Sequence, residues 1–140
     1  MLTWKEYEIL CISILEEMLD DSEYRVEYQK RVAGSRRRID ISVAERRQGG
    51  RNFVFDAKHF PIADLSKNEI DSTEAYRRDV RGSQAVILLP EYANVPQSVS
   101  NYAYECGVSI VVLWANPRSG IRGYLDKSRF KKDVKWLLGK

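Results

Sequence analysis

The sequence lacks the features that would indicate a membrane, secreted or zinc-binding protein. No apolar run approaches the roughly 18–20 residues that span a bilayer, and Lys5, Glu6 and Glu8 interrupt the start, where a secretory signal needs an apolar core. The two cysteines, Cys11 and Cys106, stand in apolar segments without metal-ligand spacing, which predicts two reduced, buried thiols. We therefore expect a cytoplasmic protein, nucleoid-associated if it is cellular, that has no membrane partner and no zinc.

A large excess of one charge is also missing. Lysine and arginine number 23 against 20 acidic residues, and this net charge of +3 is a weak indication of a nucleic-acid partner. Hydrophobic residues make up 44% and charged residues 31%, as in ordinary folded domains. A chain of 140 residues suits one core, so we expect a single domain over residues 1–140.

The basic residues are unevenly distributed, and many of them lie within or shortly before the segment 36–58. They are Arg25, Lys30, Arg31, Arg36, Arg37, Arg38, Arg46, Arg47 and Arg51. A phosphate backbone would be attracted to such a cluster, and we expect Lys30, Arg31, Arg36, Arg37 and Arg38 to contact nucleic acid. The alternative is a set of solvated strand edges, since basic side chains also protect edges from unwanted pairing.

Hydrophobic spacing predicts an alternating series of helices and strands. Helices are expected over 2–19, 66–80, 96–106 and from 126 onward, and strands over 24–32, 39–44, 52–58, 84–89 and 109–114. Short turns join the first three strands into an antiparallel meander, whereas a helix joins the last two, which indicates a parallel pair. The predicted fold class is α/β, in the order α-β-β-β-α-β-α-β-α, with a central mixed sheet flanked by helices.

Two predicted strands carry acidic residues among apolar ones. Asp40 alternates with isoleucines in one strand, and the next strand ends in Asp56-Ala57-Lys58. The two-residue period places Asp56 and Lys58 on one face, and cross-strand neighbours lie about 5 Å apart, close enough for two carboxylates to share a divalent cation. Mg²⁺ takes oxygen ligands of this kind and, with a positioned lysine, supports phosphodiester hydrolysis. A solvent-exposed ion pair is the simpler interpretation of Lys58 taken alone.

The first predicted helix contains two glutamates that differ in their surroundings. At about 100° per residue, Glu6 shares the polar face with Ser13 and Glu17. Glu8 instead aligns with the apolar residues of the core-facing stripe, where a carboxylate is costly unless it is paired or binds a cation. Glu8 is therefore a candidate third acidic ligand, unless it sits at the margin of the stripe and reaches water.

These residues together resemble the PD-(D/E)xK nuclease superfamily, and most of all its Mrr-like restriction endonuclease branch. Asp40 matches the first acidic position, Asp56-Ala57-Lys58 matches the (D/E)xK element, and Tyr7-Glu8 matches the aromatic–glutamate pair of the first helix. The resemblance implies a restriction endonuclease-like fold. It also implies catalytic roles for Glu8, Asp40, Asp56 and Lys58, and a metal shell of Glu8, Asp40, Asp56 and the Ala57 carbonyl.

The expected activity is Mg²⁺-dependent hydrolysis of DNA, with Mn²⁺ able to substitute, in a restriction-like, homing or junction-specific role. A domain of this size would act on duplex or branched DNA as a homodimer or higher homo-oligomer. His59 is given a structural or substrate-contact role. RNA cleavage remains open, and the alternative is a non-catalytic nucleic-acid-binding module, although close carboxylates would repel phosphate there.

Overall fold

A computed structural model of the chain describes residues 4–31, 38–58, 64–80, 83–90, 93–113 and 127–139. The helices are α1 (Trp4–Met18), α2 (Lys67–Asp79), α3 (Gln97–Cys106) and α4 (Lys127–Leu138), and the strands are β1 (Tyr24–Arg31), β2 (Arg38–Glu45), β3 (Asn52–Ala57), β4 (Ser83–Pro90) and β5 (Val108–Leu113). The predicted order of elements is confirmed, and each boundary falls within two residues of the expected one. None of the helices in these ranges is long and apolar enough to cross a membrane.

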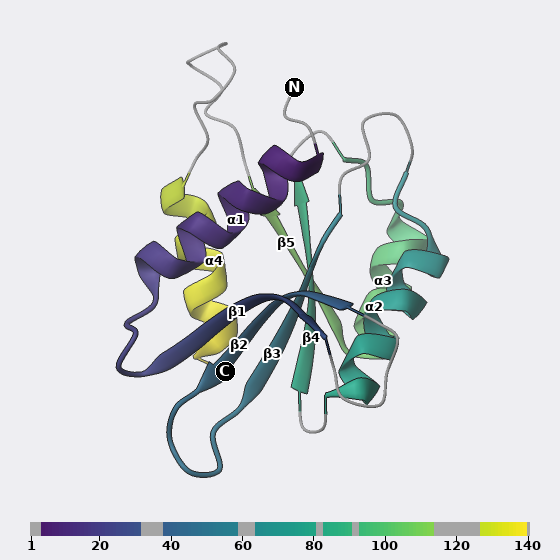
Figure 1. The fold of residues 1–140 in the computed structure, drawn as a ribbon. Coiled ribbons are helices and arrows are strands. Elements are labelled where there is room, and N and C mark those ends of the chain that lie inside the picture. The colour runs from purple at the N-terminus through teal and green to yellow at the C-terminus, as the bar shows by residue number, and fades with distance from the viewer. Residues whose placement is uncertain are drawn as a thin grey trace.

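The strands form one mixed sheet in the order β1-β2-β3-β4-β5. β1, β2 and β3 pair antiparallel, and β4 and β5 pair parallel, which confirms the predicted pairings. β3 and β4 also pair parallel. Figure 1 shows the beginning of α1 at the end of the sheet toward which β4 and β5 point. This end, where the parallel strands terminate, is called the carboxyl edge below.

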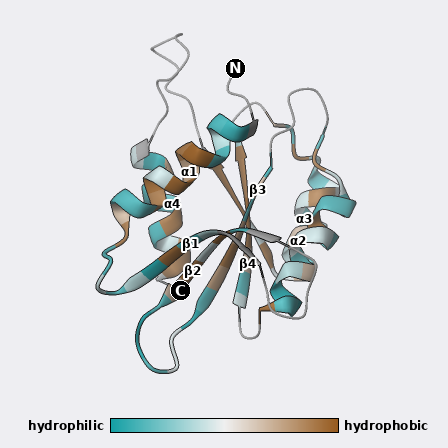
Figure 2. Ribbon diagram, viewed as in Figure 1, coloured by the Kyte–Doolittle hydropathy of each residue, from teal (hydrophilic) through white to brown (hydrophobic). Residues whose placement is uncertain are grey.

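Helices cover both faces of the sheet, so the central strands are apolar on both sides (Figures 1 and 2). Phe53 and Phe55 of β3 pack with the apolar side chains of α1 and α4 in one core. Val54 of the same strand packs with Ile70 of α2 and Val99 of α3 in the other. Because side chains alternate along a strand, Asp56 belongs to the face covered by α2 and α3.

The ends of α2 and α3 are fixed by local sequence signals. Ser66 precedes α2, and its backbone N–H donates to Glu69 at 2.9 Å, which completes the predicted capping box. Gly107 ends α3 in the left-handed conformation, with φ of 72°, where glycine avoids the strain that a side chain would bring. The start of α2 also fixes the position of its second turn, which lies against Asp56.

Candidate active site

β2 and β3 bring the two aspartates together at the carboxyl edge. Ile41 pairs with Phe55 in the antiparallel ladder, and continuing that register by one residue sets Asp40 beside Asp56. The backbone N–H of Ala57 donates to Asp40 Oδ2 at 3.1 Å, which ties the first aspartate to the second strand. The edge formed by the carboxyl ends of parallel strands is the usual place for ligand sites in open α/β sheets.

Asp56 is buried, with 3% of its surface exposed, and receives two donors on the same oxygen. Lys58 Nζ lies 3.0 Å from Asp56 Oδ2, so the two side chains share a face as the strand period predicted. Thr73 Oγ1, from α2, donates to Asp56 Oδ2 at 2.8 Å. Charge-assisted bonds of this kind are stronger than neutral ones, so the orientation of this carboxylate is fixed from two elements.

Asp40 lies in an environment that disfavours its charge. Burial, the negative charge of Asp56, a hydrogen bond with Asp56 and the charge of Glu8 together raise the pKa of Asp40 from 3.8 to about 8, against a smaller lowering by the Ala57 N–H. Crowded carboxylates with too little positive charge between them are what a divalent cation neutralises. The donor set of hard oxygens therefore fits Mg²⁺ or Mn²⁺.

Glu8 reaches this group from α1, on the other side of the sheet from α2. It is buried, with 1% of its surface exposed, whereas Glu6 is exposed. The helical spacing thus predicted correctly which of the two glutamates faces inward. Its charge acts on Asp40, and its role as a metal ligand, like that of the Ala57 carbonyl, remains a prediction.

Thr73 is a residue of this site that the sequence interpretation missed. It is fully buried, and it lies three residues after Ile70, the buried apolar residue of α2. That spacing places the two on one helical face, so a hydroxyl on the sheet-facing side of an otherwise polar helix was the signal available in the sequence.

The expected nucleic-acid contacts are only partly within the described structure. The β1–β2 ladder pairs Lys30 with Ile39 and Arg31 with Arg38, next to Asp40, so the backbones of these basic residues lie beside the carboxylates. The structure describes only the backbone of Lys30, Arg31 and Arg38, and Arg36, Arg37 and His59 lie outside the described residues. The nucleic-acid contacts expected of these six residues remain predictions.

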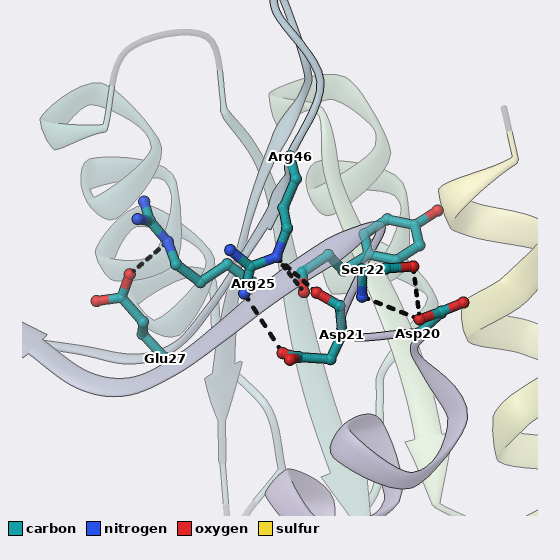
Figure 3. A network of polar contacts seen from close by, with 7 residues as sticks. Asp20, Asp21, Ser22, Arg25, Glu27 and Arg46 are labelled. Carbon is teal, nitrogen blue, oxygen red and sulfur yellow. Dashed lines mark hydrogen bonds and ion pairs between the residues drawn. The ribbon is translucent and has the colours of Figure 1, made fainter.

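Other members of the basic cluster lie at the opposite end of the sheet, which corrects the expectation of one group around the hairpin. Arg46 Nε donates to the Asp21 carbonyl at 2.6 Å and pairs with its carboxylate at 3.3 Å, beside the Asp20–Ser22 turn (Figure 3). Arg25 pairs with Glu27 at 2.9 Å, in the same view. Glu45 is five residues along β2 from Asp40, roughly 17 Å at the usual rise per residue.

Glu45, at that far end, accepts from two more of these arginines. Arg51 Nε lies 2.8 Å and Arg47 Nη2 3.4 Å from Glu45 Oε1. The bonds from Arg51 are the main reason that the pKa of Glu45 falls to about 2. These arginines stabilise the turn between β2 and β3, so they are not part of a phosphate-binding surface next to the aspartates.

Cys106 also differs from expectation, because it is half-buried where Cys11 is fully buried. Its Sγ and carboxylate oxygens of Asp71 and Glu74 lie within 4.8 Å of one another, between α2 and α3. Tyr102 donates to Asp71 at 2.5 Å, and Arg77 contacts Glu74 at 3.4 Å. Partners from the protein itself thus already engage both carboxylates of this cluster.

Comparisons with known proteins identify a fold and no family. The chain matches no protein-family model, and no curated protein is similar enough to match. Among solved structures, a protein of unknown function, AF1548, superposes with a TM-score of 0.59 at 17% identity, over 78% of this chain and 57% of that one. The protein VC1899 from Vibrio cholerae superposes with a TM-score of 0.59 at 14% identity, over 94% of this chain and 32% of that one.

A repair endonuclease from Pyrococcus abyssi is the third similar structure. It superposes with a TM-score of 0.54 at 10% identity, over 79% of this chain and 46% of that one. The fold is therefore restriction endonuclease-like, an α/β mixed sheet with flanking helices, as expected. This chain spans between about a third and somewhat over half of the length of these three proteins.

Proposed function

We propose that this chain is a metal-dependent endonuclease that hydrolyses DNA phosphodiester bonds. The observation that carries the proposal is the group of three carboxylates at the carboxyl edge, two buried and one partly buried, where burial, Asp56 and Glu8 raise the pKa of Asp40 to about 8. A structural ion pair would have no need for so much negative charge. The nuclease-like fold supports the same conclusion, and the repair endonuclease supplies an example of it with a known class of activity.

Asp40, Asp56 and Glu8 would hold one or two Mg²⁺ ions, with the Ala57 carbonyl completing the shell and Mn²⁺ able to substitute. Such a cation supplies positive charge for the phosphate and lowers the pKa of a bound water. Asp40 is held for this task by the Ala57 N–H at 3.1 Å, and Asp56 by Thr73 at 2.8 Å. Ligands fixed in this way require little rearrangement when a cation binds.

Lys58 is the proposed general base and charge-stabilising group. Its Nζ lies 3.0 Å from Asp56 Oδ2, and its side chain is 20% exposed, so the ammonium is anchored beside the carboxylates and still reaches solvent. As an ammonium it can orient an attacking water and stabilise charge on the phosphate, whereas only its neutral amine form can take up a proton from that water. The carboxylates alone would repel the substrate.

We propose duplex or branched DNA as the substrate, which is consistent with the basic backbone positions Lys30, Arg31 and Arg38 beside Asp40. Cutting both strands of a duplex with one catalytic centre per chain implies a homodimer or higher assembly. With such a substrate, the protein would act in the cytoplasm, at the nucleoid. Whether the reaction serves restriction, homing or junction processing depends on the DNA structure that is preferred.

The test is cleavage of supercoiled plasmid, linear duplex, four-way junction, methylated duplex and single strand in Mg²⁺, Mn²⁺ or EDTA. We expect cutting with either metal and none with EDTA, and loss of cutting in Asp56→Ala. The matched control is Asp21→Ala, which removes an aspartate at the far end of the sheet and should leave the rate unchanged. Full cleavage by a folded Asp56→Ala protein would refute the proposal.

Calcium separates this function from a binding module on a nuclease-like fold. Ca²⁺ can occupy a carboxylate site, so the proposed site should bind DNA more tightly as Ca²⁺ is added. A basic surface without a metal site should bind no more tightly, because added salt only screens its contacts. DNA binding that does not respond to Ca²⁺, with no cleavage of any substrate, would support the binding module.

A further inference from the structure

We propose that Thr73 is a positioning residue that orients Asp56 for the cation, an inference that rests on the proposed function. Thr73 is fully buried, and its Oγ1 donates to Asp56 Oδ2 at 2.8 Å. It comes from α2, seventeen residues after Asp56, and in the described structure its hydroxyl forms a hydrogen bond with no other residue of the proposed metal shell. Its direct link to the proposed metal shell is therefore the bond to the Asp56 carboxylate.

The position of the Thr73 hydroxyl is fixed by the way α2 sits on the sheet. The capping box from Ser66 to Glu69 sets the first turn, and Ile70 inserts into the core one turn later. Thr73 Oγ1 also lies 3.0 Å from the Glu69 carbonyl, so the single hydroxyl proton is shared between two acceptors. The carboxylate is the stronger acceptor when it is ionised, which favours the bond to Asp56 in the state that binds a cation.

Lys58 and Thr73 both donate to the same oxygen of Asp56. Lys58 approaches Oδ2 along β3 and Thr73 approaches it from α2, at 3.0 Å and 2.8 Å. A carboxylate oxygen accepts about two hydrogen bonds, so these donors fill Oδ2, and Oδ1 is the oxygen that would bind the cation. Contacts from two elements also stop the carboxylate from turning about its Cβ–Cγ bond, which a single donor would allow.

Removing the hydroxyl should therefore weaken metal binding without removing a ligand. Outer contacts of this kind typically change metal affinity by about 10–100-fold. Thr73→Val keeps the shape and branching of the side chain and deletes only the hydroxyl, whereas Thr73→Ser keeps the hydroxyl. Ser72→Val is the matched control, since Ser72 is the neighbouring hydroxyl on the exposed side of the same helix.

The experiment is calorimetric titration with Mn²⁺ in the absence of DNA, together with thermal unfolding in EDTA. It compares the wild type with Thr73→Val, Thr73→Ser and Ser72→Val. We expect the Mn²⁺ Kd to rise about 10–100-fold in Thr73→Val, and to change less than about threefold in Thr73→Ser and Ser72→Val. Thr73→Ala, which deletes the same hydroxyl in a smaller side chain, should change affinity in the same direction as Thr73→Val. It replaces Thr73→Val if the valine protein does not fold.

Two outcomes separate this inference from the function on which it rests. Wild-type Mn²⁺ affinity in folded Thr73→Val and Thr73→Ala proteins would overturn the role of Thr73 and leave the nuclease proposal intact. Absence of Mn²⁺ binding in the wild type, with no cleavage, would overturn both. A loss of affinity in Thr73→Val that Thr73→Ser does not show supports the positioning role, because a purely structural role would appear in the unfolding temperature and not in the Kd.

Discussion

Replacing Asp40 with asparagine should stabilise the metal-free protein while abolishing the proposed nuclease activity. The pKa of Asp40 is about 8 in the folded state, against an ordinary value of 3.8. Because the folded state holds this proton more tightly than the unfolded chain, stability is fully present below about pH 4 and is lost as the pH rises toward 8. Asparagine keeps the acceptor for the Ala57 N–H and carries no charge, so it avoids this loss.

The size of the gain follows from the same shift. One pKa unit corresponds to about 1.4 kcal/mol, so the full shift bounds the effect at roughly 6 kcal/mol. Asp40 is only partly buried, and relaxation and water entry reduce such penalties, so we expect Asp40→Asn to raise the free energy of unfolding by about 1–3 kcal/mol at pH 8. At pH 5 the gain should be well under half of that, since wild-type Asp40 is then protonated in the folded state.

The assay is urea unfolding of the wild type and Asp40→Asn in EDTA at pH 5 and pH 8. Equal m-values for the two proteins are the check on two-state behaviour. Asp56→Asn is the matched comparison. It should be destabilising by about 1–3 kcal/mol, because it weakens the bonds from Lys58 and Thr73 and leaves the partly buried Lys58 ammonium without its carboxylate. An Asp40→Asn protein that is no more stable than the wild type at pH 8 would refute the electrostatic reasoning.

Two further predictions address the ends of the sheet separately. Lys58→Met keeps the apolar stem and removes the ammonium, so the single-turnover cleavage rate at saturating Mg²⁺ should fall about 10²–10³-fold; a rate within threefold of the wild type would exclude Lys58 from the chemistry. Glu45→Gln weakens the bonds with Arg51 that lower the pKa of Glu45 to about 2. Because the pKa of Glu45 is lowered, the stabilisation from its bonds with Arg51 is present above the ordinary pKa of 4.5 and is lost as the pH falls toward 2. The free energy of unfolding of Glu45→Gln, measured in urea, should therefore be about 1 kcal/mol lower than that of the wild type at pH 7, and the difference should shrink at lower pH. Its cleavage rate should equal that of the wild type.

The order of helices and strands could be predicted because it depends on local patterns. The capping box at Ser66 and the glycine at Gly107 set boundaries within one turn of chain, and the alternation around Asp56 determines which face it occupies. The placement of Asp40 beside Asp56 followed from the same alternation once the two strands were taken as a hairpin. Helical spacing selected Glu8 over Glu6 for the same reason.

Contacts between distant segments could not be predicted in this way. Arg46 pairs with Asp21, which is 25 residues away, and that contact exists only because the end of β2 returns to the start of β1. Thr73 was missed because a threonine in a polar helix gives no indication of which carboxylate it will meet. The packing of α3 on α2 likewise decides that Cys106 stays half-buried beside Asp71.

The placement of the acidic residues in two layers makes a final prediction about dynamics. Glu8 belongs to α1 on one face of the sheet, whereas Asp56 and Thr73 belong to the face covered by α2. A cation held by Glu8 and by the aspartates would join the two helical layers. Mn²⁺ should therefore slow amide hydrogen exchange in the first turns of α1 and in the middle of α2, but not in the turn at Asp20. In Glu8→Gln the slowing should persist in α2 and disappear from α1. Slowing confined to α2 in the wild type would exclude Glu8 from the metal shell and leave the two aspartates as its carboxylate ligands.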